Sequence, residues 1–160
     1  MKSFAQMPKS EDVGCVLLAS SYLAHKKATK VGMEEFLAGL YLGCFEHLLV
    51  YFTNWGSLVR FASQCCGLKY PAWHYWTDIS QQMRSDSDDV LVLFGVDVQK
   101  LLEEAGDIAM RCPHPPESQM VALEHLLGAI SANQQFEICK QFVQSGLDLQ
   151  MVQAKFSGTE

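Results

Sequence analysis

Cysteine and histidine are the residue types in this chain that could support metal binding or nucleophilic catalysis. Two groupings stand out, the adjacent pair Cys65-Cys66 and the segment Cys112-Pro113-His114. A tetrahedral zinc site needs four such ligands, and no second Cys-x-x-Cys or His-x-x-x-His pair completes the set. We therefore expect no metal and no cofactor, and we interpret the six cysteines as packing thiols.

A thiol hydrolase would need a cysteine, a histidine and a third polar side chain that converge in space. The sequence shows no nucleophile framed by glycines and no phosphate-binding glycine loop that ends in Lys and Ser or Thr. Five histidines and six cysteines nevertheless permit a catalytic geometry that the sequence does not reveal. A small helical hydrolase or ligand-binding protein is therefore the alternative to a non-catalytic chain.

Aromatic side chains are concentrated in one short segment. Its members are Tyr70, Trp73, His74, Tyr75 and Trp76. On a helix these positions cover nearly the full circumference, so at least one large ring is expected near the surface. Because Trp and Tyr are enriched at the centres of interfaces, we predict that Trp73 and Trp76 contribute to partner binding. The alternative, that these rings fill an internal seam, fits the pattern equally well.

Composition restricts the class of partner. The chain has 160 residues, of which 49% are hydrophobic and 19% are charged, a balance that suits one domain with a buried core. Its net charge of −6 argues against nucleic acid, because phosphate contacts need clustered Lys and Arg. Three glutamates in the most apolar stretch, 33–52, argue against a membrane span. No export signal is evident, so we predict a cytoplasmic location with reduced thiols.

The elements that position these side chains are predicted to be helices, and each helix has a counterpart later in the chain. A helix expected at about 12–27, capped by Ser10 or Asp12, has an apolar stripe that recurs 85 residues later, where Asp97 is the expected cap. The two stripes are Val13, Val16, Leu17, Ser20 and Ala24, and Val98, Leu101, Leu102, Ala105 and Ala109. A second pair of stripes is offset by 90 residues, from Met33 to Leu123.

Turn residues also recur in register. The third helix of each copy ends at a glycine followed by leucine, at Gly67 and at Gly146. The fourth helices are expected after Pro71 and after Asp148. We predict an all-α fold of about eight helices, arranged as two pseudo-twofold four-helix repeats in a single domain, 1–160. Repeat 1 spans about 10–84, a linker spans 85–96 and repeat 2 spans about 97–156, with both chain ends frayed.

The alternative to a duplication is that amphipathicity alone makes any two helices look alike. The second helices also have a more specific likeness. The segments VGMEEFLAGL at 31–40 and ALEHLLGAI at 122–130 resemble the paired Glu-His-Leu-Leu helices of the Clp N-terminal domain. The stretch 145–152 looks like that family's closing turn into its last helix, and together the matches cover about 12–156.

A more literal Glu-His-Leu-Leu string lies at 46–49, but aligning it would make the preceding linker far too long. We therefore place Glu34 opposite Glu124, which leaves Glu35 and Phe36 where the family has His and Leu.

The Clp N-terminal domain precedes the ATPase rings of Clp/Hsp100 unfoldases. The resemblance implies a non-catalytic domain that docks substrates, adaptors or a secretion-sheath helix, with any AAA+ ATPase in a separate module. It leaves open whether this is the N-terminal domain of a larger unfoldase or a free-standing relative. It also implies that Glu34 and Glu124, with the adjacent His125, bind a partner, and that each carboxylate receives a cationic group. The alternative for His125 is a half-buried helix residue that contacts no ligand. The simpler interpretation is that both glutamates stabilise helix N-termini, where the helix dipole favours a carboxylate.

Overall fold

The computed structural model describes residues 3–69, 72–82, 94–111 and 120–156, and within these ranges the protein is all-α, which confirms the predicted fold class. The described residues form nine α-helices and two short 3-10 helices, with isolated bridges in place of a sheet. The elements are η1 (Phe4–Gln6), α1 (Glu11–Lys26), α2 (Met33–Gly43), α3 (Phe45–Leu48), η2 (Leu49–Tyr51), α4 (Trp55–Cys66), α5 (Ala72–Gln82), α6 (Val96–Arg111), α7 (Leu123–Ser131), α8 (Glu137–Gln144) and α9 (Leu149–Phe156).

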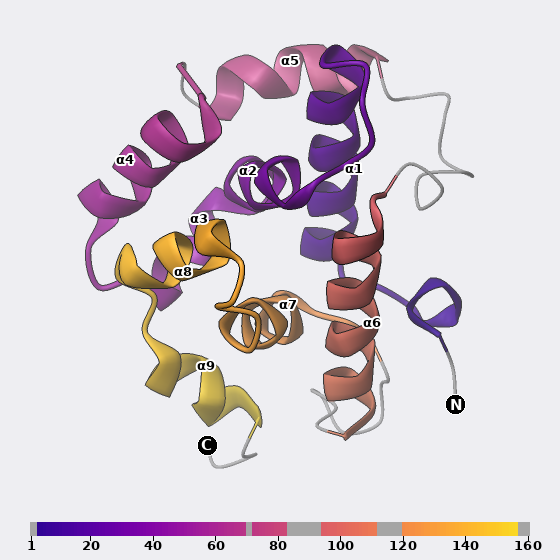
Figure 1. The fold of residues 1–160 in the computed structure, drawn as a ribbon, viewed down its shortest axis with the longest axis vertical. Coiled ribbons are helices and arrows are strands. Elements are labelled where there is room, and N and C mark those ends of the chain that lie inside the picture. Colours follow the sequence, from indigo (N-terminus) through magenta and orange to yellow (C-terminus); the bar gives the residue numbers. More distant parts are fainter. Residues whose placement is uncertain (1–2, 70–71, 83–93, 112–119, 157–160) are drawn as a thin grey trace.

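The helices fall into two groups that follow the order of the chain. In Figure 1, α1, α2, α4 and α5 occupy the upper part of the molecule, and α6 to α9 occupy the lower part. The closest packing in each group is between its first two helices, α1 with α2 and α6 with α7. The helices α2 and α7 are seen nearly end on in the middle of the view, so the second helix of each group lies at the centre of the fold.

Helix boundaries follow the expected capping chemistry in most places. The Ser10 hydroxyl accepts a hydrogen bond from the Val13 N–H at 3.3 Å and so caps α1. The Asp148 carboxylate does the same for α9. The glycine endings are also confirmed, since Gly67 and Gly146 have φ of +69° and +116°. The predicted cap at Asp97 is wrong: α6 begins at Val96, so Asp97 lies inside the first turn.

The backbone segments that lead into the helices pair crosswise between the two groups. The Ser10 N–H, just before α1, donates to the Val121 carbonyl, just before α7, at 2.9 Å. The Gly95 N–H, just before α6, donates to the Val31 carbonyl, just before α2, also at 2.9 Å. From 10 to 95 is 85 residues and from 31 to 121 is 90, the same offsets as in the sequence. These reciprocal contacts support the two-repeat arrangement, which stays a prediction.

The first turns of α2 and α7 are closed by the same device. The Glu35 carboxylate accepts a hydrogen bond from the Gly32 N–H at 2.9 Å, and the His125 Nδ1 accepts one from the Ala122 N–H at 2.9 Å. In each case the third helical residue reaches back to the residue before the helix, as in a capping box. Glutamate and histidine therefore do the same structural work at corresponding positions, which agrees with placing Glu34 opposite Glu124.

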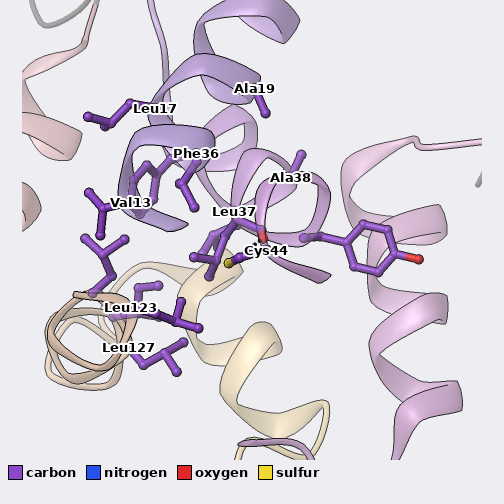
Figure 2. Close-up of a cluster of buried hydrophobic side chains, with 14 of the residues drawn as sticks. Val13, Leu17, Ala19, Phe36, Leu37, Ala38, Cys44, Leu123 and Leu127 are labelled. Carbon is purple, nitrogen blue, oxygen red and sulfur yellow. Dashed lines mark hydrogen bonds between the residues drawn. The ribbon is translucent and has the colours of Figure 1, made fainter. Parts of the chain in front are cut away.

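One cluster of buried side chains draws on every described helix. Figure 2 shows its centre, where Leu123 and Leu127 of α7 meet the side chains of α1 and α2, including Val13 and Leu37. The helices α1 and α2 approach so closely that a Cβ atom on Gly39 would lie 2.1 Å from the Oγ of Ser20. Small residues at this crossing therefore determine how deeply α2 is buried.

The N-terminal segment differs from the sequence-based expectation. The N-terminal end was expected to fray, but Phe4 and Met7 are buried and the Phe4 N–H donates to the Glu103 carboxylate of α6 at 2.9 Å. The expectation is wrong because Phe4 and Met7 pack against α6. Residues 3–9 have no apolar periodicity from which this contact could be predicted. The connection between α2 and α4 is longer than the corresponding connection between α7 and α8, and this insertion forms α3 and η2. The segment 52–53 that follows it pairs with 146–147 of the second group. The residues 83–93, which include the start of the proposed linker, and the last residues, 157–160, lie outside the described part.

Among the described helices, none combines the length and the apolar character needed to cross a membrane.

Candidate functional site

An open groove with a volume of about 780 Å³ lies between the C-terminal end of α2, the short α3, the helix α4 and the helix α5. Its surface is mainly apolar, with charged side chains at its edges. The groove therefore combines a large desolvated area with a few polar groups, as binding sites commonly do. The apolar side chains that line it include Tyr41, Phe45, Trp55, Val59, Leu68 and Trp76.

Trp55 is the most prominent of these side chains. Asn54 caps α4, since its side-chain oxygen accepts a hydrogen bond from the Ser57 N–H at 3.1 Å, and this fixes Trp55 as the first helical residue. Trp55 is 55% exposed. Its ring packs edge to face on Phe45, with centroids 6.1 Å apart, and Phe45 packs in the same way on Tyr41 at 5.1 Å. The three rings form one aromatic wall with an open outer edge.

Trp76 lines the groove from the side of α5. Its indole N–H donates a hydrogen bond to the Leu42 carbonyl at 2.6 Å, which satisfies a carbonyl in the last turn of α2 and orients the ring. The loop after α4 is held to α5, the helix that contains Trp76, because the Lys69 N–H donates a hydrogen bond to the Tyr75 hydroxyl at 3.0 Å. Trp76 was predicted as a partner-binding residue, and the structure places it in the groove. Trp73 lies in α5, but its side chain falls outside the described part, as do Tyr70 and Pro71.

One edge of the groove carries a histidine–carboxylate pair. The His47 Nδ1 of α3 lies 2.8 Å from each carboxylate oxygen of Asp12, in the first turn of α1. The hydrogen bond and charge of Asp12 raise the pKa of His47, and the charges of Glu46 and Glu124 act in the same direction. The pair therefore connects the inserted helix α3 to the start of α1.

Glu34 lies outside this groove, at the start of α2. Its carboxylate accepts a hydrogen bond from the Lys27 ammonium at 2.8 Å, and the same ammonium lies 2.9 Å from Glu35. The two carboxylates raise the pKa of Lys27 to about 12. The cationic group that Glu34 was expected to take from a partner is therefore supplied by the end of α1, and the structure favours the helix-stabilising interpretation.

Glu124 is engaged internally as well, because its carboxylate accepts a hydrogen bond from the Tyr51 hydroxyl of η2. Burial raises the pKa of Tyr51, and the bond to Glu124 raises it further. His125 is fully buried and caps α7 with its Nδ1. The structure places His125 in the core and not at the surface where a partner would bind. Of the predicted partner-binding residues with a described side chain, the structure places Trp76 alone in the groove.

The described cysteines are all free thiols, and several have pKa values shifted away from reactivity. Burial raises the pKa of Cys66 to about 12 and that of Cys139 to about 11. It also raises the pKa of Cys15 and Cys44, with nearby carboxylates adding to the effect. A nucleophilic cysteine needs the opposite shift. Within the described residues no group of three or more His, Cys, Asp or Glu could hold a metal ion, whereas Cys112 and His114 lie outside them.

Sequence reasoning missed Trp55, Glu46, His47 and Lys69 as groove residues. The Asn54 cap could have placed Trp55 at an exposed helix start, but α3 is too short for a periodic pattern to locate its side chains. Comparisons of the chain with protein-family models, with curated proteins and with solved structures gave no match.

Proposed function

We propose that this chain is a non-catalytic, protein-binding domain that docks a substrate or adaptor segment for a Clp/Hsp100-type unfoldase. The segment would lie in the groove between α2, α4 and α5, and a AAA+ ATPase module would act on the docked protein. The likeness of 31–40 and 122–130 to the Clp N-terminal domain supports the type of partner. A cytoplasmic location is part of the proposal, because the described cysteines are free thiols.

The observation that carries this proposal is the open aromatic wall of the groove. Trp55 has a large apolar ring on a rigid helix, and more than half of the residue is accessible to a partner. Tryptophan is enriched at interface hot spots, and a ring held by Phe45 loses little conformational entropy on binding. A groove of about 780 Å³ has room for several apolar side chains of a peptide.

The raised pKa values of Cys15, Cys44, Cys66 and Cys139 support a binding function over thiol catalysis. The groove itself contains Cys44, which is buried, and its edge contains His47, which is already paired with Asp12. These side chains are better suited to support the wall of the groove than to attack a substrate.

The test is a binding titration by fluorescence anisotropy with labelled, reduced and alkylated α-lactalbumin as an unfolded model protein. We expect the chain to bind this unfolded form in preference to the native protein, and Trp55→Ala to weaken binding about tenfold. Met151→Ala on α9 is the matched control, because Met151 is also a large exposed apolar residue and lies outside the groove. Equal losses for both variants, or no binding by the unmodified chain, would contradict the proposal.

A further inference from the structure

We propose that the groove selects a bipolar segment, one with an apolar centre, a basic residue at one end and an acidic group at the other. Glu46 would receive the basic end and Lys69 the acidic end. This inference rests on the proposed docking function and adds the chemical class of the segment and its orientation.

The two charges lie at opposite ends of the groove. Trp55, the first residue of α4, touches Phe45, so α3 and with it Glu46 lie beside the N-terminal end of α4. Lys69 follows the C-terminal end of the same helix, three positions after Cys66. A helix of 12 residues is about 18 Å long, so roughly this distance separates the two ends of the groove.

Both side chains are available to a partner. Neither the Glu46 carboxylate nor the Lys69 ammonium forms an ion pair or a hydrogen bond with any described residue, and both residues are exposed. The other titratable side chains at the edge of the groove are Asp12 and His47, which are paired with each other. Within the described part of the chain, the groove thus presents a negative charge without an ion-pair partner at one end, Glu46, and a positive charge without one at the other, Lys69.

Charge complementarity determines the occupant that fits. A segment of about 18 Å is roughly 12 residues as a helix or five to six residues as a strand. Its centre would pack on Val59, Ala62 and Trp76, and its terminal charges would meet Glu46 and Lys69. Exposed ion pairs contribute only about twofold to fivefold each, so the apolar centre supplies most of the affinity and the charges supply selectivity and direction.

The test uses four synthetic peptides of 12 residues with the same apolar centre and different ends. One has a basic and an acidic end, one has two basic ends, one has two acidic ends and one has glutamine at both. We expect the bipolar peptide to bind the unmodified chain most tightly, by about twofold to fivefold per charge over the glutamine peptide. Its advantage should shrink at high salt, because the charges are exposed.

Single charge reversals should change which peptide binds best. Glu46→Lys makes both ends of the groove positive, so the peptide with two acidic ends should become the tightest ligand. Lys69→Glu makes both ends negative, so the peptide with two basic ends should become the tightest. Glu137→Lys and Lys140→Glu are the matched controls, because these residues are exposed on α8 outside the groove and should leave the order unchanged.

The outcomes separate this inference from the function on which it rests. If all four peptides bind, Trp55→Ala weakens all of them, and the order of affinities ignores both reversals, the bipolar inference is wrong and the docking function stands. If none of the peptides and no unfolded protein binds, the docking function itself fails. A change of order with the α8 controls as large as that with the groove variants would assign the selectivity to the overall charge of the chain.

Discussion

The imidazole of His47 lies against the carboxylate of Asp12, with Nδ1 2.8 Å from each carboxylate oxygen. This pair joins the inserted helix α3 to the first turn of α1. A second bond, from the Tyr51 hydroxyl to Glu124, joins η2 to the first turn of α7. The insertion is therefore fastened to the starts of two helices that belong to different halves of the chain, and it forms one edge of the groove.

The Asp12–His47 pair predicts a pH-dependent contribution to stability. The folded-state pKa of His47 is raised above 6.5, so the stabilisation is complete below pH 6.5 and is lost as the pH rises through the raised value. A titration of the histidine ring signals by NMR should give His47 a pKa above 6.5, and Asp12→Asn should lower it. Urea unfolding at pH 6 and pH 8.5 should show that His47→Gln reduces the pH dependence. An unchanged pKa in Asp12→Asn would refute the assignment.

The crossing of α1 and α2 predicts a large cost for a single methyl group. In Gly39→Ala the new Cβ would lie 2.1 Å from Ser20 Oγ and 2.7 Å from Ser20 N, and the backbone cannot move away without separating the helices. We expect a loss of about 3 kcal/mol in the free energy of unfolding, measured by urea titration. Gly14→Ala in α1 is the control: nothing lies within 4 Å of its Cβ, so we expect a gain of up to about 1 kcal/mol. Similar effects at both glycines would contradict the close packing.

The Lys27 ammonium predicts an acid-sensitive link between α1 and α2. Burial alone would raise the pKa of Glu35, but the hydrogen bonds from Lys27 and from the Gly32 N–H outweigh it and lower the pKa. Such a group stabilises the fold above its unfolded pKa, and the contribution is lost as the pH falls through the lowered value. Lys27→Met should therefore destabilise the chain by about 1 kcal/mol at pH 7, because Lys27 is half exposed, and by less at pH 3.

The neighbouring Lys26 provides the comparison for that measurement. Its ammonium lies 3.9 Å from the Asp78 carboxylate, and both side chains are about half exposed. Lys26→Met should therefore change the free energy of unfolding less than Lys27→Met does at either pH, because water screens this longer and more exposed pair. If Lys26→Met and Lys27→Met changed the free energy of unfolding equally, the ion pairs of Lys27 with Glu34 and Glu35 would not be the cause of its effect.

The buried His125 is predicted to stabilise the fold as a cap of α7. Its Nδ1 accepts the Ala122 N–H, so His125→Gln, which keeps a hydrogen-bond acceptor, should retain more stability than His125→Leu, which has none. We expect the two variants to differ by about 1 kcal/mol in thermal or urea unfolding. If leucine is as good as glutamine, packing alone explains why this position is buried.

The periodic helices were predictable because their apolar stripes are long. The first helix was expected at about 12–27 and is observed at Glu11–Lys26. The burial of Phe4 and Met7 in the N-terminal segment was not predictable, since only contact with α6 makes those residues part of the core. The helix α3 has four residues, which is about one turn and too short for any period. Tertiary contacts, not local pattern, therefore determine both segments.

The site was less predictable than the fold for a similar reason. Glu34 was a sensible candidate for receiving a cation, and the structure supplies that cation from Lys27. The path of the loop between α1 and α2 brings the two together, and no spacing rule anticipates it. Trp76 could be predicted as a groove residue from its residue type alone, because a helix so rich in aromatic residues leaves at least one large ring near the surface. The Asn54 cap could have located Trp55 at a helix start, but its packing on Phe45 is a tertiary contact that no local pattern predicts.

The backbone segments just before α1, α2, α6 and α7 pair between the two halves of the chain, so each half supplies hydrogen-bond partners for the helix starts of the other. The residue before α1 needs Val121, and the residue before α6 needs Val31, so a fragment containing only one half would leave both of its helix starts incomplete. Two fragments divided within 83–93 should therefore stay largely unstructured when separate and regain helicity when mixed. That behaviour would make this small protein a candidate for fragment complementation, with folding itself as the readout.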